Sequence, residues 1–457
     1  MPATREVKPG LVLATCCISL FLVSMDVTIV NVALPAIAHD LHASVAGLQW
    51  AIDGYTLVIA SFLMLAGSTA DRLGRRRVFQ TGLAVFSAGS LLCSVAPTIH
   101  GLVAFRIVQA LGGAMLNPVA MSIIVNTFTE PRARARAIGT WGAVFGISMA
   151  LGPLLGGVLV DHVGWRSIFW INVPVALSAI GLTARFVPES RAPTPRRFDP
   201  IGQILVAVLL AGVVSALIEG PELGWHAPIV IIGFAAAAVA IVALIPYELR
   251  REQPLLELRF FRSRPFAAAI VLAIVAFTAF NGFLFLSSLY LQLARGMSAE
   301  RAGLQMLPVA VTLVVCAPMS GRLVGAGRTR LAMVGAGVAM TIAAAITTTF
   351  DVATGIAVLS VGYALFGVGQ GLVNTPITNA AVSGMPKEQA GVASALASTS
   401  RQVGASLGVA IAGTVGHGES FVATLHAYSW LVVACGLAVI AIGFYATATR
   451  ATGSRPG

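Results

Sequence analysis

A few charged residues lie inside long apolar segments of this 457-residue chain, and their chemistry needs an explanation. Asp26 lies in an apolar run over residues 11–38, and Arg106 lies in another over residues 101–128. A charged side chain at the centre of a membrane helix costs roughly 2.5 to 3.5 kcal/mol on insertion scales. A carboxyl group retained at that cost can bind and release protons, and a facing arginine lowers the cost by pairing with it.

The depths of these two residues predict that they can meet. Asp26 is about ten residues from the outer end of its segment, roughly 15 Å deep, and Arg106 is roughly 8 Å deep. A long arginine side chain can bridge that difference. We expect Asp26 to take a proton from outside and release it inside under the influence of Arg106, although the pair could be only a structural clamp.

Asp53 is the other acid well within an apolar run, one turn into residues 45–70. It could be a second site for a proton or cation. It could equally face the outer interface of a membrane, where a carboxylate costs little.

The elements that must position these residues are transmembrane helices. The chain is 57% hydrophobic and 10% charged, whereas soluble domains carry about 25% charged residues. The composition predicts an all-α, multi-pass membrane protein. We count fourteen runs long enough to span a bilayer, near residues 11–38, 45–70, 78–98, 101–128, 137–160, 167–188, 200–219, 227–247, 266–294, 302–325, 331–350, 353–383, 389–416 and 427–448.

The basic residues predict the orientation of these runs. With a cytoplasmic N-terminus, 24 of the 29 Lys and Arg fall in cytoplasmic tails and loops and only three in outer loops, as the positive-inside rule requires. Both termini are then cytoplasmic, in a multi-pass protein of the cytoplasmic membrane. The net charge of +11 therefore reflects topology and contact with anionic membrane lipid, and it does not predict a nucleic-acid partner.

Other residue types predict no catalytic, metal or cofactor site, so the chain is not expected to be an enzyme. All five cysteines lie in apolar runs and are interpreted as packing residues. All seven histidines fall in or beside outer loops, where they are interpreted as solvated.

Internal repeats predict two related bundles. Gly74-Arg75-x-Arg77 matches Gly327-Arg328-x-Arg330, and GGAMLN (residues 112–117) resembles GQGLVN (residues 369–374). Each match relates a span to the one eight positions later, so the simplest arrangement is six spans, two inserted spans and six more. The predicted units are a tail (1–10), a first bundle (11–188), an inserted pair (200–247), a second bundle (266–448) and a tail (449–457). Two homologous bundles with a site between them are a transporter design.

At this point the motifs resemble those of the major facilitator superfamily, and within it the fourteen-span drug:proton antiporter family. The resemblance covers nearly the whole chain. The loop after the second span is similar to the superfamily's loop signature, with Gly67, Asp71, Arg72, Gly74, Arg75, Arg76 and Arg77. The fourth span resembles the proton motif through Arg106, Gln109 and Gly112, with Ala110 where Gly is usual. The fifth resembles the antiporter motif through Gly146, Gly152, Pro153, Gly156 and Gly157, and DVTIVNVALP (residues 26–35) is similar to the first-span motif.

The resemblance implies roles for the loop and for the fifth span. Asp71, with Arg72, Gly74 and Arg75, is expected to gate transport by pairing across the interface between bundles; a plain positive-inside anchor is the alternative. The equivalent position in the second half is Val324, which lacks the acid. The glycines of the fifth span permit close helix approach and Pro153 can kink the helix, so this span is expected to act as a hinge.

Substrate contact is expected from polar and aromatic residues on the spans facing the central cavity. Phenylalanines recur every three residues in the ninth span and could line a greasy cavity, although packing or lipid contact is an equally open interpretation. The candidate substrate residues are Asn31, Gln109, Phe277, Phe280, Asn281 and Asn374.

The favoured function is proton-coupled antiport that exports hydrophobic or amphipathic compounds such as drugs, antibiotics or dyes. The alternative is a proton-coupled transporter of a specific metabolite or lipid-like substrate, or a symporter. An ATP-driven pump would need a phosphate-binding loop, and neither lysine, Lys8 or Lys387, lies in one. A receptor would be expected to carry a sizeable soluble domain, whereas no loop exceeds about twenty residues.

Overall fold

The computed structural model describes residues 8–192, 199–251, 254–383, 385, 390–415 and 420–448, and the elements in that part of the chain are helices. The expected C-terminal tail (449–457) and most of the expected N-terminal tail (1–10) lie outside the described residues.

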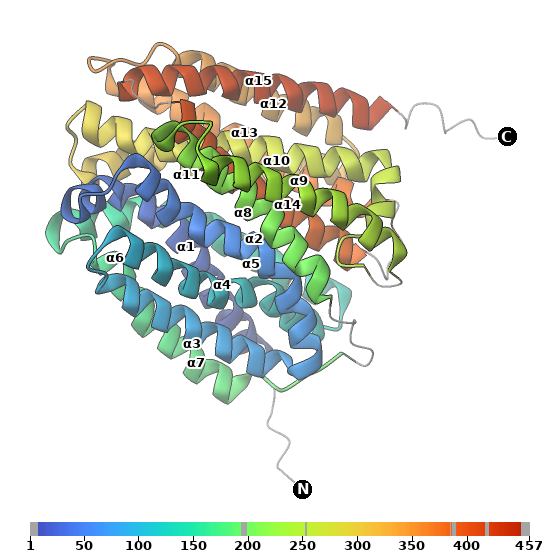
Figure 1. Cartoon of the computed structure of the whole chain (residues 1–457). Coiled ribbons are helices and arrows are strands. Elements are labelled where there is room, and N and C mark those ends of the chain that lie inside the picture. The colour runs from blue at the N-terminus through green and yellow to red at the C-terminus, as the bar shows by residue number, and fades with distance from the viewer. Residues whose placement is uncertain are drawn as a thin grey trace, which may run out of the picture.

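The first group of helices covers the N-terminal part of the chain, coloured blue to blue-green in Figure 1. α3 packs between α4 and α7, and α1 packs against α4, α5 and α7. The helices are α1 (Pro9–Leu41), α2 (Val45–Leu73), α3 (Arg75–Ser94), α4 (Ile99–Thr127), α5 (Pro131–His162), the short α6 (Ser167–Trp170) and α7 (Asn172–Phe186).

The second group lies on the opposite side of the molecule, yellow to red in Figure 1. α10 packs against α13, α14 and α15, and α12 packs between α13 and α15. The helices are α10 (Arg264–Leu289), which continues through a wider turn at η2 (Tyr290–Ala294), α11 (Ala299–Gly325), α12 (Thr329–Thr347), α13 (Ile356–Val382), α14 (Ala390–Val415) and α15 (Phe421–Ala448). A short 3₁₀ helix, η1 (Leu258–Arg262), precedes them.

Two helices connect the groups in the chain, α8 (Pro200–Leu223) and α9 (Pro228–Arg250), green in Figure 1. They pack closely because Gly212 and Gly233 face each other: a Cβ on Gly212 would stand 2.5 Å from the Gly233 carbonyl oxygen. α8 also packs on α2 and α14, one helix from each group. α9 keeps large apolar side chains exposed, such as Val242 at 72%, as lipid contact allows.

Local sequence explains where many of these helices begin. Ser44, Thr98 and Ser298 cap the first turns of α2, α4 and α11 by accepting a hydrogen bond from a backbone N–H three residues on. Between α2 and α3 the chain breaks at Gly74, whose φ of 112° is favourable only for glycine.

Within the described residues, 12 helices are long and apolar enough to span a membrane. The sequence predicted fourteen, so that number is not confirmed. The two remaining predicted spans fall on α3 and α14, which are helices of 20 and 26 residues but fall below that apolarity. α3 carries three arginines in its first turn, and α14 is rich in Ser, Thr and Gly. Helices packed among other helices need less apolar surface than helices facing lipid.

The two groups are joined by hydrogen bonds at the end of the molecule where α1 connects to α2, here called the α1–α2 end. Gln49 of α2 donates to the Val409 carbonyl of α14 (2.8 Å), and Gln292 donates to the Val32 carbonyl of α1 (2.9 Å). The Asp161 carboxylate of α5 accepts from the backbone N–H of Glu300 (2.8 Å) at the start of α11. An acid at a helix N-terminus is favourable, so the structure is closed at this end.

Candidate functional site

Asp26 lies in the middle of α1 with no exposed surface, and both its carboxylate oxygens are occupied. Oδ2 forms an ion pair with Nη1 of Arg106 on α4. Oδ1 accepts hydrogen bonds from Gln109 Nε2 (2.8 Å) and from Asn172 Nδ2 on α7 (3.1 Å). The predicted meeting of Asp26 and Arg106 is therefore what this structure shows.

Arg106 is 1% exposed and is held from three sides. Its Nη1 also donates to Gln109 Oε1 (2.8 Å), and its Nε donates to the Ala51 carbonyl of α2 (3.1 Å). The guanidinium carbon lies 4.2 Å from the ring centroid of Tyr55, a cation–π contact. The guanidinium is therefore neutralised and positioned by α1, α2 and α4 together.

Ser90 of α3 closes the network, because its hydroxyl accepts from both Gln109 Nε2 (2.7 Å) and Asn172 Nδ2 (3.1 Å). We call Asp26, Ser90, Arg106, Gln109 and Asn172 the Asp26 cluster. A carboxylate, an arginine and three neutral hydrogen-bonding groups, all buried, form a site that can hold or release a single proton.

The local sequence explains how the cluster assembles. Arg106 and Gln109 are three residues apart on α4 and so share a face. Glycines let α3 approach that helix: a Cβ on Gly89 would stand 2.5 Å from the Gln109 Cα, and one on Gly112 would meet the Phe86 backbone. Gly112 in the fourth-span motif therefore serves close packing.

Sequence reasoning missed Ser90, Asn172 and Tyr55. Asn172 gave a usable signal, since it is an amide in the apolar stretch FWINVPVAL. Ser90 gave none, because serine is common in membrane helices, and neither did Tyr55.

Asp53 is also fully buried, so it does not face an exposed interface. Its Oδ1 accepts from the Thr56 hydroxyl (3.1 Å), and its Oδ2 has no hydrogen-bond partner among the described residues. Asp53 interacts across the α2–α14 contact with Ser406, whose own hydroxyl is unpartnered too. The structure places it apart from the Asp26 cluster.

The expected gating residues lie where α2 turns into α3. Asp71 pairs with Arg75 (2.9 Å), its neighbour one turn on, so the ion pair in this structure is local and does not cross the bundle interface as expected. The Glu189 carboxylate accepts from the Arg76 backbone N–H (3.1 Å), and it lies 2.5 Å from where a Cβ on Gly74 would stand. The loop is thus fastened to the chain after α7. Arg72, in the last turn of α2, also takes part in an interaction.

The expected hinge residues place α5 against both groups. A Cβ on Gly152 would collide with the Thr28 hydroxyl, and one on Gly156 would stand 2.7 Å from Ile29 Cγ1, both on α1. On the α11 side, a Cβ on Gly157 would stand 2.5 Å from the Ala299 carbonyl oxygen, and one on Gly146 would stand 3.0 Å from a Val314 methyl group. Pro153 lies inside the helix between these contacts.

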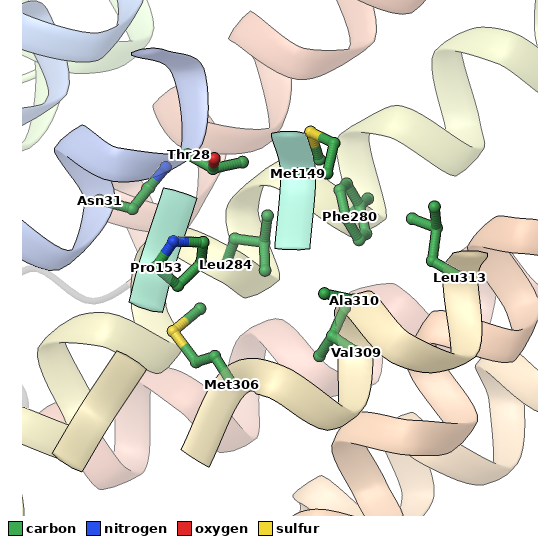
Figure 2. Close-up of a pocket in the computed structure, with 10 residues that line it drawn as sticks. All are labelled: Thr28, Asn31, Met149, Pro153, Phe280, Leu284, Met306, Val309, Ala310 and Leu313. Atoms are coloured by element: carbon green, nitrogen blue, oxygen red, sulfur yellow. The ribbon is translucent and has the colours of Figure 1, made fainter. Parts of the chain in front are cut away.

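A small cavity lies between α1, α5, α10 and α11, where side chains from both groups converge (Figure 2). Its volume is about 20 Å³, room for about one water molecule, so it is nearly closed at this height. Its walls are mostly apolar, with an amide and a hydroxyl from α1. The lining residues are Thr28, Asn31, Met149, Pro153, Phe280, Leu284, Met306, Val309, Ala310 and Leu313.

Two of the candidate substrate residues, Asn31 and Phe280, line this cavity. Asn31 Oδ1 is buried without a partner. Gln109 belongs to the Asp26 cluster. The remaining three are half-buried outside the cavity lining: Phe277 accepts on its backbone carbonyl from Asn281 Nδ2 (3.0 Å), and the Asn374 carbonyl accepts from Arg401 (3.5 Å).

A multi-pass helical protein with two helix groups, a cavity between them and a buried ion pair is built as a membrane transporter. The Major Facilitator Superfamily model matches residues 16–409, and the chain belongs to that superfamily, whose members are transporters and not enzymes.

Several relatives carry names of resistance and export proteins. The chain is 37% identical over 398 residues to the multidrug resistance protein Stp of Mycobacterium tuberculosis, covering 87% of this chain and 74% of that one. It is 37% identical over 413 residues to the tetracenomycin C resistance and export protein of Streptomyces glaucescens, covering 89% and 76%. It is 33% identical over 410 residues to the methylenomycin A resistance protein of Bacillus subtilis, covering 89% and 87%.

Solved structures show the same fold at low sequence identity. The POT family transporter PepTSo aligns with a TM-score of 0.71 and 17% identity, covering 98% of this chain and 99% of that one. The human organic anion transporter MFSD10 aligns with a TM-score of 0.65 and 16% identity, covering 95% and 100%.

Proposed function

We propose that this protein is a proton-coupled antiporter that exports hydrophobic or amphipathic compounds across the cytoplasmic membrane. The observation that carries the proposal is the Asp26 cluster, a fully buried carboxylate whose arginine partner is equally buried. A clamp between helices could be built from apolar side chains at lower cost. A titratable group at this depth supports coupling instead.

The relatives support the substrate class. Three of them are named for multidrug resistance, for tetracenomycin C resistance and export, and for methylenomycin A resistance. The cavity between the two groups is lined mainly by Met, Leu, Val and Phe, with the Asn31 amide as its unpaired polar group. Such walls suit apolar compounds of varied shape, so we propose drug-like substrates, with Asn31 and Phe280 among the contacts.

The energy for export comes from protons in this proposal. One charge crossing the membrane potential supplies about 2.3 kcal/mol per 100 mV, and a pH gradient adds to that. Protonation of Asp26 weakens its pairing with Arg106, and this change biases the equilibrium between the two conformations.

Alternating access follows from the arrangement of the two groups. We propose that α1–α7 and α10–α15 are the moving bundles, that α8 and α9 are insertions, and that fourteen helices span the membrane with both termini in the cytoplasm. The structure is then an inward-facing state, since the hydrogen bonds of Gln49, Gln292 and Asp161 close the outer side. The glycines of α5 let this helix slide or tilt between α1 and α11.

The two remaining charged sites take supporting roles. We propose Asp53 as a second titratable acid, since its Oδ2 is unpaired in a fully buried position. We propose that the local Asp71–Arg75 pair opens in the outward-facing state, where Asp71 pairs with the second bundle instead.

Efflux of ethidium, a fluorescent lipophilic cation, tests the proposal in cells that lack their own exporters. Cells expressing the protein should lose preloaded ethidium faster than control cells, and a proton uncoupler should abolish the difference. Efflux that persists after uncoupling while ATP is present would contradict proton coupling. A screen with antibiotics, dyes and lipids then defines the substrate range.

A further inference from the structure

The inserted helix α8 is fastened at both ends and stands off in the middle. Near one end, Gln203 donates to the Ser61 carbonyl of α2. Near the other end, Trp50 of α2 donates to Glu219 (2.7 Å), and Thr414 of α14 donates to the backbone of α8 (2.8 Å). These bonds hold α8 across the contact between α2 and α14.

Between the fastened ends lies a cavity of about 160 Å³, here called the α8 chamber. Leu57 of α2, Leu210 and Val213 of α8, and Leu407 of α14 line it, and Ser406 is its polar residue. An apolar cavity of about 150 Å³ stays dry and can bind benzene. The α8 chamber therefore has the size and polarity for one aromatic ring or a branched alkyl group.

An unpaired carboxylate stands next to this apolar space. Asp53 lies one helical turn before Leu57, so the two share a face of α2, and Asp53 interacts with Ser406 of the chamber wall. Asp53 Oδ2 and the Ser406 hydroxyl are both buried without a hydrogen-bond partner in the described chain. A buried acceptor left unpaired is costly, whereas a ligand carrying positive charge would satisfy it.

We propose that the α8 chamber is a binding subsite for lipophilic cations, separate from the central cavity. The apolar part of the ligand fills the chamber, and its cationic centre lies beside the Asp53 carboxylate. This deepens the proposed export function and rests on it. A lipid acyl chain would fill the chamber but would leave the carboxylate unpaired, so a cation fits both features better.

Equilibrium binding of tetraphenylphosphonium to the purified full-length protein in detergent tests this assignment without any proton gradient. Val213→Phe fills the chamber, and it should weaken binding about tenfold, the order of effect that small changes in apolar pocket volume produce. Val208→Phe is the matched control, since Val208 lies on the same helix and is 39% exposed; its affinity should equal that of the wild type. Wild-type affinity in Val213→Phe would overturn the proposal, and Val213→Leu serves if the phenylalanine variant does not fold.

Charge is tested by comparing tetraphenylphosphonium with the neutral triphenylphosphine oxide. Asp53→Asn should weaken binding of the cation and leave binding of the neutral compound unchanged. Unchanged cation binding in Asp53→Asn would reduce the chamber to an apolar lipid site and overturn the cation assignment. Loss of proton-driven efflux with intact binding at the chamber would count against the proposed function alone.

Discussion

Asp26 and Arg106 differ in what each can do when its partner is lost. A carboxyl group can take up a proton and become neutral, whereas a guanidinium stays charged inside a protein. Arg106 is held by Asp26 as its ion-pair partner, and its other contacts are a carbonyl, an amide oxygen and aromatic rings. Stranding the arginine is therefore the more damaging of the two changes.

We predict that Asp26→Asn lowers the amount of folded protein more than Arg106→Gln does. Removing one member of a buried pair costs about 3–5 kcal/mol, and the Asp26→Asn variant cannot recover any of that by protonation. Thermal unfolding in detergent measures both variants. A less stable Arg106→Gln variant would show that the stranded arginine is not the dominant cost.

The double variant Asp26→Asn/Arg106→Gln should recover much of the lost stability, because it leaves no buried charge in the cluster. Transport should remain absent, since no titratable group is left there. A double-mutant cycle measures the coupling between the two positions. Simple additivity of the two effects would contradict the direct ion pair seen in the structure.

The sequence could predict this pair because a charge in an apolar run is conspicuous and depth limits its partners. It could not predict Ser90 or Asn172, since a hydroxyl or amide has no cost that marks it within a helix. Their roles depend on how α3 and α7 pack, and a linear pattern does not contain that information.

At the scale of single elements, α5 depends on small residues where it crosses α1. We predict that Gly152→Ala reduces the yield and thermal stability of the protein, because its Cβ would collide with the Thr28 hydroxyl. Gly139→Ala in the same helix is the control: a Cβ there meets nothing within 4 Å, and alanine should favour the helix by about 0.5–1 kcal/mol. Equal stability of the two variants would mean that α1 and α5 can separate freely at this contact.

The loop between α2 and α3 belongs to the same scale. We predict that Asp71→Asn leaves protein amount and substrate binding intact but slows turnover, because Asp71 alternates between Arg75 and a partner on the second bundle. Cysteine labelling at the ends of α2 and α11, on a background without native cysteines, should show more of the inward-facing state. Identical labelling in wild type and variant would reduce the loop to a positive-inside anchor.

The expected number of spans shows where sequence patterns lose power. Apolar runs identify helices that face lipid, such as α9, with high certainty. α3 and α14 pack among other helices, so they carry arginine, serine and glycine and fall below the apolarity of a typical span. Their lengths of 20 and 26 residues support the fourteen-span proposal.

The whole molecule is closed at the α1–α2 end by polar contacts between its two groups. We predict that Gln292→Ala, which removes a hydrogen bond to the Val32 carbonyl, shifts the population away from the closed arrangement by about 0.5–1.5 kcal/mol, the net worth of one hydrogen bond. Distances between spin labels on α1 and α10 at that end should lengthen in a larger fraction of molecules. An unchanged distance distribution would show that apolar packing alone sets the closed end.

The central claim is that protons moving through Asp26 drive the export of substrate. It is tested most directly with purified protein in liposomes that carry an imposed pH gradient and an internal pH-sensitive dye. Addition of ethidium should collapse the gradient with wild-type protein, partly with Asp26→Glu, and not with the folded Asp26→Asn/Arg106→Gln variant. Collapse of the gradient at the wild-type rate by that double variant would contradict the claim.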